Sequence, residues 1–371
     1  MERGNTVGFD SGSLTFRMYY PTGALPGDAV RRFASDAAPP LNMLGPGGMS
    51  GWVTGRHLLD REITEAKARI GGYLWLTLMK AERRIPPALL RAECMLAELA
   101  RQQRDGGAIN RSARAEIRRE VTDRLLPDMP PQLSGISFVL DAAGEWLYAT
   151  ALSPKASETL AAAFKKTTGA DILEATPAAI ALKRKQKNVR DMDPASFSPE
   201  VPDSEAEPSL GQDFLTWLWF VMETRGGSIN APGRGEFGFM IEGPLVFVAE
   251  GNGAHQAVLN KGTPLLSAEA KTALLSGKKL CAARLTMARE NDKWSVYLDS
   301  ETFGFRSLKF PKTAPAGLEG RFMERMSLLE TFRDAFLAMF DAFVDERFNT
   351  ATWRETCREM KKWVAGRQAR R

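Results

Sequence analysis

An arginine-rich stretch, residues 110–127 (NRSARAEIRREVTDRLLP), holds the side chains of this sequence best suited to bind an anion. An asparagine or serine cap at its start and a proline at its end predict a helix of about four turns. At about 3.6 residues per turn, Arg111, Arg114 and Arg118 share one side, and Ile117 lies on an adjacent apolar seam. Guanidinium groups present fork-shaped donors that suit phosphate oxygens. The helix therefore predicts an edge facing a nucleic-acid backbone, and an ordinary solvated face fits the same pattern equally well.

Residues that could carry out catalysis or hold a metal ion are sparse. The two histidines, His57 and His255, have no partner of a hydrolytic triad or zinc site nearby. No GxxxxGK[ST] phosphate loop occurs, and the paired glycines lack the strand–glycine–helix context of a dinucleotide site. Asp60 with Glu65 and Lys67 comes nearest to a metal-dependent nuclease motif, but the surrounding pattern is helical. These residues indicate neither a catalytic site nor a cofactor site, and the nuclease is kept as an alternative.

The bulk composition is that of a globular protein with two or three domains. The chain has 371 residues, of which 44% are hydrophobic and 26% charged. A net charge of +5 is compatible with nucleic-acid binding without establishing it. Three distant cysteines, Cys94, Cys281 and Cys357, support neither a disulfide framework nor a zinc cluster and favour a reducing compartment. Because we find neither a signal-peptide layout nor a membrane-length apolar run, we expect a cytoplasmic protein without a membrane partner.

The arginine-rich helix is expected to form half of a helical hairpin. A preceding helix should begin at Pro86-Pro87, since prolines suit the first turn, and should run to about Arg104. Asp105-Gly106-Gly107 separates the two helices. The first helix is expected to bury the leucines on its apolar side, which are Leu89, Leu90, Leu96 and Leu99.

Shifts in composition divide the chain into six expected segments. They are an N-terminal α+β part at 1–84, the basic helical hairpin at 85–130, a β-hairpin plus helix at 131–182, a linker at 183–213, a C-terminal sheet domain at 214–318 and a helical extension at 319–371. The linker begins with a basic cluster and continues at 191–212 with prolines, serines and acids but no Lys or Arg. Such a composition buries too little apolar surface to offset the entropy of ordering, so we predict a mobile, protease-sensitive connection there.

Apolar and aromatic residues in the second half of the chain indicate where its core lies. Strands at 280–288, 294–299 and 303–310 are expected as a meander with one buried face, since Trp294, Val296 and Leu298 alternate with polar residues. Trp217, Trp219 and Phe220 could stack on bases, although interleaved leucines favour core packing. A stripe of apolar residues near the C-terminus likewise favours core over a partner surface; its members are Leu328, Leu329, Phe332, Phe336, Phe340 and Phe343.

Several pieces of the chain, taken in order, resemble one known family. They are Gly51-Trp52-Val53, Ile85-Pro86-Pro87, residues 96–104, Glu120-Val121 with Leu125-Leu126-Pro127, the hairpin at 136–151 with Ser153 and Lys155, Gly277-Lys278-Lys279-Leu280, and Ser307-Leu308-Lys309-Phe310. Together they resemble RdgC, a family of bacterial recombination-associated DNA-binding proteins. The resemblance covers about residues 13–182 and 255–311, and it rests on the order of the elements.

The RdgC resemblance implies an α+β fold with mixed or antiparallel sheets and a long helical hairpin, in a horseshoe-like protomer that closes into a ring-shaped homodimer. Double-stranded DNA would pass through the basic hole without sequence preference, and the protein would modulate recombination by limiting RecA-type filaments. The resemblance also implies a protein that is not an enzyme and that is associated with the nucleoid. The implied partners are duplex DNA, a second copy of the chain and a RecA-type recombinase. The implied hole-lining residues are Arg101, Arg104, Arg111, Arg114, Arg118, Arg119, Lys261, Lys278 and Lys279.

This chain departs from the family pattern in three places. It has an insertion near 183–213 and an added helical tail from about residue 320, and its hairpin turn is Gly-Gly where the family has a lysine run. The alternative from another class is a protein-interaction module that acts on recombination proteins and scarcely binds DNA.

Overall fold

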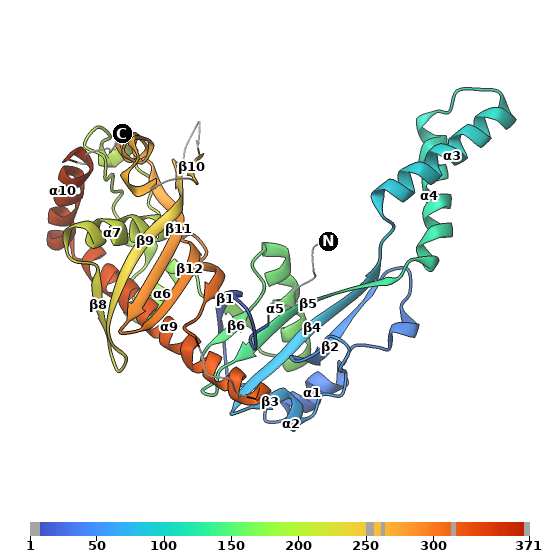
Figure 1. The fold of residues 1–371 in the computed structure, drawn as a ribbon, viewed down its shortest axis with the longest axis horizontal. Coiled ribbons are helices and arrows are strands. Elements are labelled where there is room, and N and C mark those ends of the chain that lie inside the picture. The colour runs from blue at the N-terminus through green and yellow to red at the C-terminus, as the bar shows by residue number, and fades with distance from the viewer. Residues whose placement is uncertain (1–7, 250–255, 261–263, 313–316, 367–371) are drawn as a thin grey trace. The chain divides into compact units, whose positions relative to one another are not determined.

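The computed structural model describes residues 8–249, 256–260, 264–312 and 317–366 (Figure 1). The chain folds into two compact units. Unit 1 comprises residues 1–23, 139–158 and 171–371, and unit 2 comprises residues 24–138 and 159–170. Both units combine helices with antiparallel strands, so the α+β class expected from the sequence is confirmed.

An antiparallel sheet forms the centre of unit 1. Its strands follow the order β10 (Gln256–Leu259), β9 (Gly235–Val248), β11 (Lys279–Arg289), β12 (Asp292–Asp299), β13 (Gly304–Lys309), β1 (Leu14–Pro21) and β6 (Leu147–Ala149). Two short strands extend it, β7 (Ile172–Glu174) beside β1 and β8 (Ser228–Ala231) beside β9. The expected meander is confirmed as β11–β12–β13. β9 continues through Gly243-Pro244, and its residues on both sides of that pair are matched with β11 across two register irregularities.

Helices cover one face of this sheet and complete the core. They are α6 (Pro177–Lys185), α7 (Leu210–Thr224), α8 (Ala268–Leu275), α9 (Leu318–Arg347) and α10 (Thr350–Gly366). The ring of Phe336 on α9 packs edge-on against that of Phe305 on β13, with 5.0 Å between centroids. Trp217, Trp219 and Phe220 on α7 are buried. The expectation that both aromatic groups form core is therefore confirmed.

An ionic triad is buried where α7, β11 and α9 meet. The Nζ atom of Lys279 lies 2.6 Å from Oδ1 of Asp213, and Nε of Arg347 lies 3.1 Å from Oδ2 of the same carboxylate. Side-chain exposures are 0% for Asp213, 6% for Lys279 and 3% for Arg347. Burying charges is costly unless they are paired, so each member depends on the others.

The segment expected as a linker, 183–213, is packed inside unit 1 instead. Its ends belong to α6 and α7, and two short 3₁₀ turns, Val189–Asp191 and Asp203–Glu205, lie between them. Phe197 and Ser198 are buried, and the Ser198 hydroxyl donates to the carbonyl of Leu275. The composition argument missed this because a few apolar side chains and serine hydrogen bonds order an otherwise polar segment.

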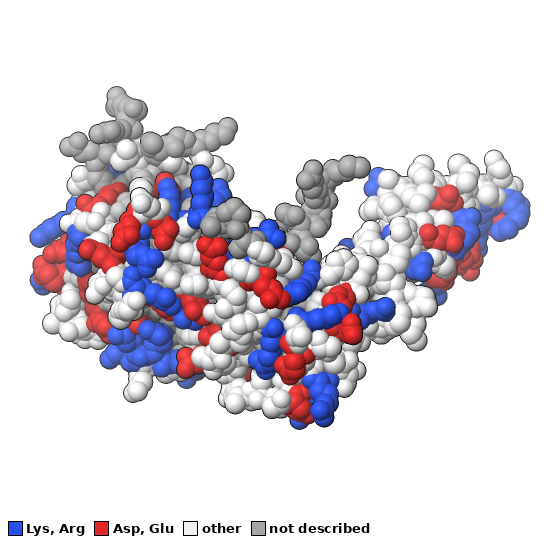
Figure 2. All heavy atoms as spheres, turned by 60° about the horizontal axis from the view of Figure 1, so that its bottom comes forward, with Lys and Arg blue, Asp and Glu red and all other residues white. Residues whose placement is uncertain are grey.

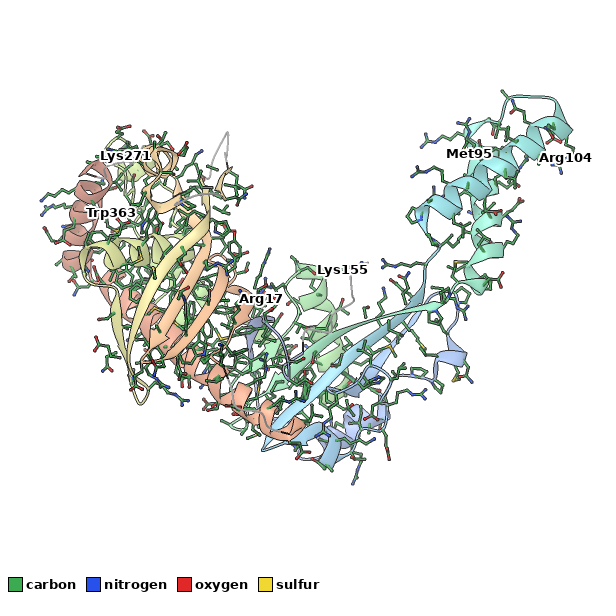
Figure 3. All side chains as sticks on the ribbon, viewed as in Figure 1. Arg17, Met95, Arg104, Lys155, Lys271 and Trp363 are labelled. Carbon is green, nitrogen blue, oxygen red and sulfur yellow. The ribbon has the colours of Figure 1, made fainter. Side chains whose placement is uncertain are left out.

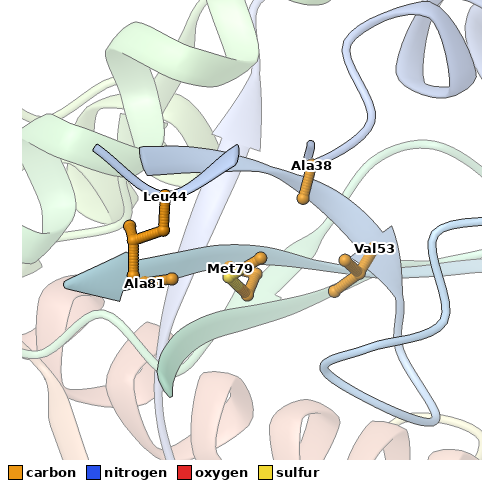
Figure 4. Close-up of a cluster of buried hydrophobic side chains, with 5 residues drawn as sticks. All are labelled: Ala38, Leu44, Val53, Met79 and Ala81. Carbon is orange, nitrogen blue, oxygen red and sulfur yellow. The ribbon is translucent and has the colours of Figure 1, made fainter. Parts of the chain in front are cut away.

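Unit 2 is built on the remaining strands of the strand order. Its strands are β5 (Pro131–Leu140, whose last two residues fall in unit 1), β4 (Tyr73–Arg83) and β2 (Met49–Thr54) in that order, with β3 (Arg69–Ile70) on β4. Its helices are α1 (Ala29–Ser35), α2 (Glu65–Ala68), α3 (Pro87–Asp105), α4 (Arg111–Leu125) and most of α5 (Pro154–Thr168), with 3₁₀ turns at Leu41–Met43 and Leu126–Asp128. Figure 4 shows one of its core clusters, made of Ala38, Leu44, Val53, Met79 and Ala81.

The expected helical hairpin is present as α3 and α4, which follow β4 and precede β5 (Figure 1). The side chain of Asn110 accepts a hydrogen bond from the backbone N–H of Ala113 and caps α4. Gly106 ends α3 in the left-handed conformation, at φ 66°. Ile117 and Val121 are buried between the helices, as the apolar seam predicted.

The leucines of α3 lie differently from the expectation. Leu89, Leu96 and Leu99 are 36%, 64% and 56% exposed, and Leu90 alone of the predicted four is less exposed than these. The reason is that a hairpin of two helices covers only one side of each. The opposite side of α3 has no neighbour among the described residues, so its apolar face stays open.

We predict that the protein is less stable at alkaline pH, because its fold buries a thiol and several phenols. Burial raises the pKa of Cys357 to about 12 and raises the pKa values of Tyr20 and Tyr148. A cysteine in the unfolded chain titrates near 8.5, so above about that pH the unfolded state binds fewer protons than the folded one. The unfolding free energy should therefore fall as pH rises from about 8.5 towards 12. Urea titrations at about pH 8 and about pH 10 check this; equal stability at both would contradict it.

Candidate nucleic-acid interface

The sheet of unit 1 has one covered and one open face. On the covered face, Trp294 of β12 is fully buried and its Nε1–H donates to the carbonyl of Leu328 on α9, 3.1 Å away. Because side chains alternate along a strand, Ser295, Tyr297 and Asp299 point to the opposite face. These three are only partly buried. The open face is thus the polar side that the alternation in β12 predicted.

Basic residues flank Tyr297 on this open face. In the strand register, Arg284 of β11 lies directly opposite Tyr297, and Arg306 of β13 lies opposite it on the other side. Such cross-strand neighbours have Cβ atoms about 5 Å apart. The next row, one pleat along, runs from Thr286 through Ser295 to Lys309. An aromatic ring between two guanidinium groups is a surface that suits phosphates and bases.

The cations of this face are not neutralised by neighbouring acids. We call them the sheet-face cations, and they are Arg284, Lys293, Arg306 and Lys309. No carboxylate of the described residues forms an ion pair with any of them. Glu242 lies opposite Arg284 in the register and accepts from the Thr286 hydroxyl, and Asp299 accepts from the backbone N–H of Glu301, so both acids lower the local positive charge without forming an ion pair with these cations. Lys293, Arg306 and Lys309 are exposed and Arg284 is half-buried, so their charge is available to a ligand.

The pKa of Tyr297 reflects the two arginines beside it. Burial raises the pKa of its phenol, while the positive charges of Arg306 and Arg284 act in the opposite direction. The phenol thus stays neutral at physiological pH and presents its ring between two cations.

The hairpin arginines divide into paired and unpaired sets. Across the hairpin, Nη1 of Arg101 lies 2.8 Å from Oε2 of Glu116, and Nε of Arg114 lies 3.4 Å from Oε2 of Glu98. Arg104, near the turn (Figure 3), pairs with Asp105 at 3.0 Å. Figure 2 accordingly shows basic and acidic side chains interspersed over the hairpin. Acids on each helix therefore neutralise arginines on the other helix.

Three of the expected hairpin residues keep their charge available. Arg111, Arg118 and Arg119 are exposed on α4, and no carboxylate in the described part of the chain forms an ion pair with them. They form a second, smaller basic surface on unit 2.

The three lysines that the RdgC resemblance implied as DNA-binding residues lie in different environments. Lys261 lies outside the described residues. Lys278 is half-buried beside the start of β11. Lys279, its neighbour, is a correction: its ammonium group is held in the buried triad with Asp213, so it is not offered to a ligand. Lys279 is the first residue of β11 and is buried with it, whereas Lys278 lies just before the strand.

The residues considered for a nuclease partly converge. Nζ of Lys67 lies 3.1 Å from Oδ1 of Asp60 and 2.7 Å from Oε2 of Glu62, whereas Glu65 pairs with Arg69. Among the described residues, no group of three or more His, Cys, Asp or Glu side chains is arranged to hold a metal ion. No helix in the same residues is long and apolar enough to cross a membrane.

One known protein family matches the part of the chain that contains the hairpin. The matching model carries the description "RdgC: Putative exonuclease, RdgC". Residues 48–187 match the RdgC family. The RdgC match runs from the start of unit 2's sheet through the hairpin and α5 to the end of α6, and it confirms the resemblance expected from the sequence over these residues. No curated protein matches the chain.

Sequence reasoning missed the sheet-face cations, which lie beyond the RdgC match. A signal was present: in β12 and β13, basic residues occupy the polar positions of the alternation, as Lys293, Arg306 and Lys309 do.

Proposed function

We propose that this protein binds duplex DNA through the phosphate backbone without sequence preference. The observation that carries the proposal is the set of sheet-face cations, which lack carboxylate partners among the described residues and surround Tyr297. Cations on a flat sheet contact phosphates but do not enter a groove to read base edges, so binding without sequence preference follows. The match to RdgC supports a role in recombination. We further propose that the protein acts at the nucleoid by limiting RecA-type filaments.

We also propose that two copies assemble into a ring around DNA, with α3 as one contact between them. The apolar stripe near the C-terminus is mostly buried in the core of the protomer and is not available to a second copy. We therefore assign the contact between copies to the exposed apolar side of α3. Leu89, Leu96 and Leu99 recur at spacings of seven and three residues, and Met95 beside them is 59% exposed (Figure 3). Exposed apolar residues at such spacing suit the packing of a second helix.

The dimer proposal is tested by Leu96→Glu. Because Leu96 is exposed in the protomer, the variant should fold normally, while a buried charge in the interface should weaken dimerisation by about tenfold or more. Sedimentation equilibrium at micromolar concentration measures the effect. Ala115→Glu adds the same charge at an exposed position of α4 and serves as the control. A wild-type monomer, or an unchanged dimer of Leu96→Glu, would count against α3 as a contact.

DNA binding is tested with random-sequence duplex across a salt series. Backbone binding predicts that log K falls linearly with log salt, with a slope of about −0.9 for each phosphate contact. Absence of binding would favour the alternative, a module that interacts with recombination proteins.

A nuclease is the second candidate, favoured by the approach of Asp60 and Glu62 to Lys67 and by the description of the matching model. It predicts that Mg²⁺ leads to shortening of a labelled duplex and that Asp60→Asn abolishes the shortening. An intact duplex after prolonged incubation would remove this candidate.

A further inference from the structure

The segment at 191–209 is an acidic strap along unit 1. It contains six Asp or Glu residues and no Lys or Arg. Its first part is fixed, since Phe197 is 3% exposed and packs edge-on against Trp353 of α10. Residues around Asp203 and Glu205 are exposed. The strap thus holds a row of carboxylates at the surface beside α10.

The outer side of α10 carries a group of cations. The helix packs inward through Trp353, Met360 and Val364, all buried. Two turns of its outer side carry Arg354, Arg358, Lys361 and Lys362. Arg354 and Lys362 are exposed and form no ion pair with a carboxylate of the described residues, while Arg358 pairs with Glu355 within the helix. These cations of α10 are as suited to bind a chain of phosphates as the sheet-face cations are.

The strap meets these cations through one carboxylate. Nζ of Lys361 lies 2.8 Å from Oδ1 of Asp203, and the same oxygen accepts from the backbone N–H of Ser196, 3.0 Å away. A cavity of about 440 Å³ between strap and helix is lined by both members of this pair, together with Asp191, Asp193 and Arg354. The Lys361–Asp203 pair is partly exposed, at 29% and 53%, and such pairs are weak. A phosphate can therefore compete with Asp203 for Lys361.

We propose that α10 is a second polyanion-binding surface, which the strap masks by placing Asp203 on Lys361. The carboxylate stands where a phosphate of bound nucleic acid would stand. The surface is separate from the sheet-face cations and does not depend on them for its chemistry.

The test is Asp203→Asn in the full-length protein, with a random-sequence duplex as the probe. The side-chain oxygen of asparagine can still accept the hydrogen bond from the backbone N–H of Ser196. The negative charge that competes with a phosphate for Lys361 is removed. Affinity should rise by about two- to fivefold, the range that an exposed ion pair is worth. Because Lys361 becomes a phosphate contact, the salt slope should also steepen by about 0.9. Asp191→Asn removes one charge from the same strap without touching Lys361, and it should leave the slope unchanged.

The double variant Asp203→Asn/Lys361→Gln decides the mechanism, since it should show none of the gain. The proposal is overturned if the gain persists without Lys361, if Asp191→Asn reproduces it, or if Asp203→Asn binds as the wild type does. Binding by Asp203→Asn alone, with no wild-type binding, supports the second surface and contradicts the function proposed for the sheet face. Wild-type binding that Asp203→Asn leaves unchanged contradicts only the second surface. No binding by either overturns both.

Discussion

Asp213→Ala should lower the free energy of unfolding by about 3–5 kcal/mol, because it leaves two buried cations without their anion. Lys279 and Arg347 both depend on the Asp213 carboxylate, which is fully buried. Neither cation has another carboxylate partner among the described residues; Lys279 keeps the carbonyl of Glu207, and Arg347 that of Asp193. Urea unfolding followed by circular dichroism measures the change.

Asp345→Ala is the matched control for Asp213→Ala. Asp345 pairs with Lys185 near the surface and is 59% exposed, so its loss should cost no more than about 1 kcal/mol. If the two variants were equally stable, the triad would not hold the core together.

Replacing Arg284, Arg306 and Lys309 together by glutamine should weaken duplex binding at low salt by at least about a hundredfold. Hydrogen bonds to charged groups are worth roughly 1.5–3 kcal/mol each, so removing three of them exceeds that factor even after partial compensation. The variant should stay folded, because these side chains lie on the open face of the sheet and the core is on the other. Fluorescence anisotropy with labelled random duplex gives the affinity.

The hairpin supplies a control of equal charge. Replacing Arg111, Arg118 and Arg119 by glutamine removes three positive charges from exposed positions of α4. A smaller loss of affinity than for the sheet-face variant would place the main DNA-binding surface on the sheet. A larger loss would place it on the hairpin, where the RdgC resemblance first put it.

Local signals predicted much of the fold. The Asn110 cap, the glycine that ends α3 and the seam of Ile117 and Val121 all follow from short stretches of sequence, and the structure has each of them. The β11–β12–β13 meander and the aromatic side of α9 follow equally from periodicity. These features depend on neighbours within a few residues or on one buried face.

The candidate site was less predictable because it depends on distant partners. Glu98 and Glu116 neutralise arginines on the opposite helix, and helix periodicity alone does not reveal such pairs. Lys279 meets Asp213 across 66 residues of sequence, and the neighbouring Lys278 does not. Which apolar face stays open likewise depends on what packs beside it, so the exposure of Leu96 on α3 could not be read from its amphipathic pattern.

The central claim is that the sheet-face cations bind DNA phosphates. Its most direct test is the dependence of log K on log salt for a random duplex, compared between the wild type and the sheet-face variant with Arg284, Arg306 and Lys309 replaced by glutamine. We predict that the slope of the variant is shallower by about 0.9 for each phosphate that it no longer binds, with every duplex sequence weakened alike. A folded variant with the wild-type slope would contradict the claim.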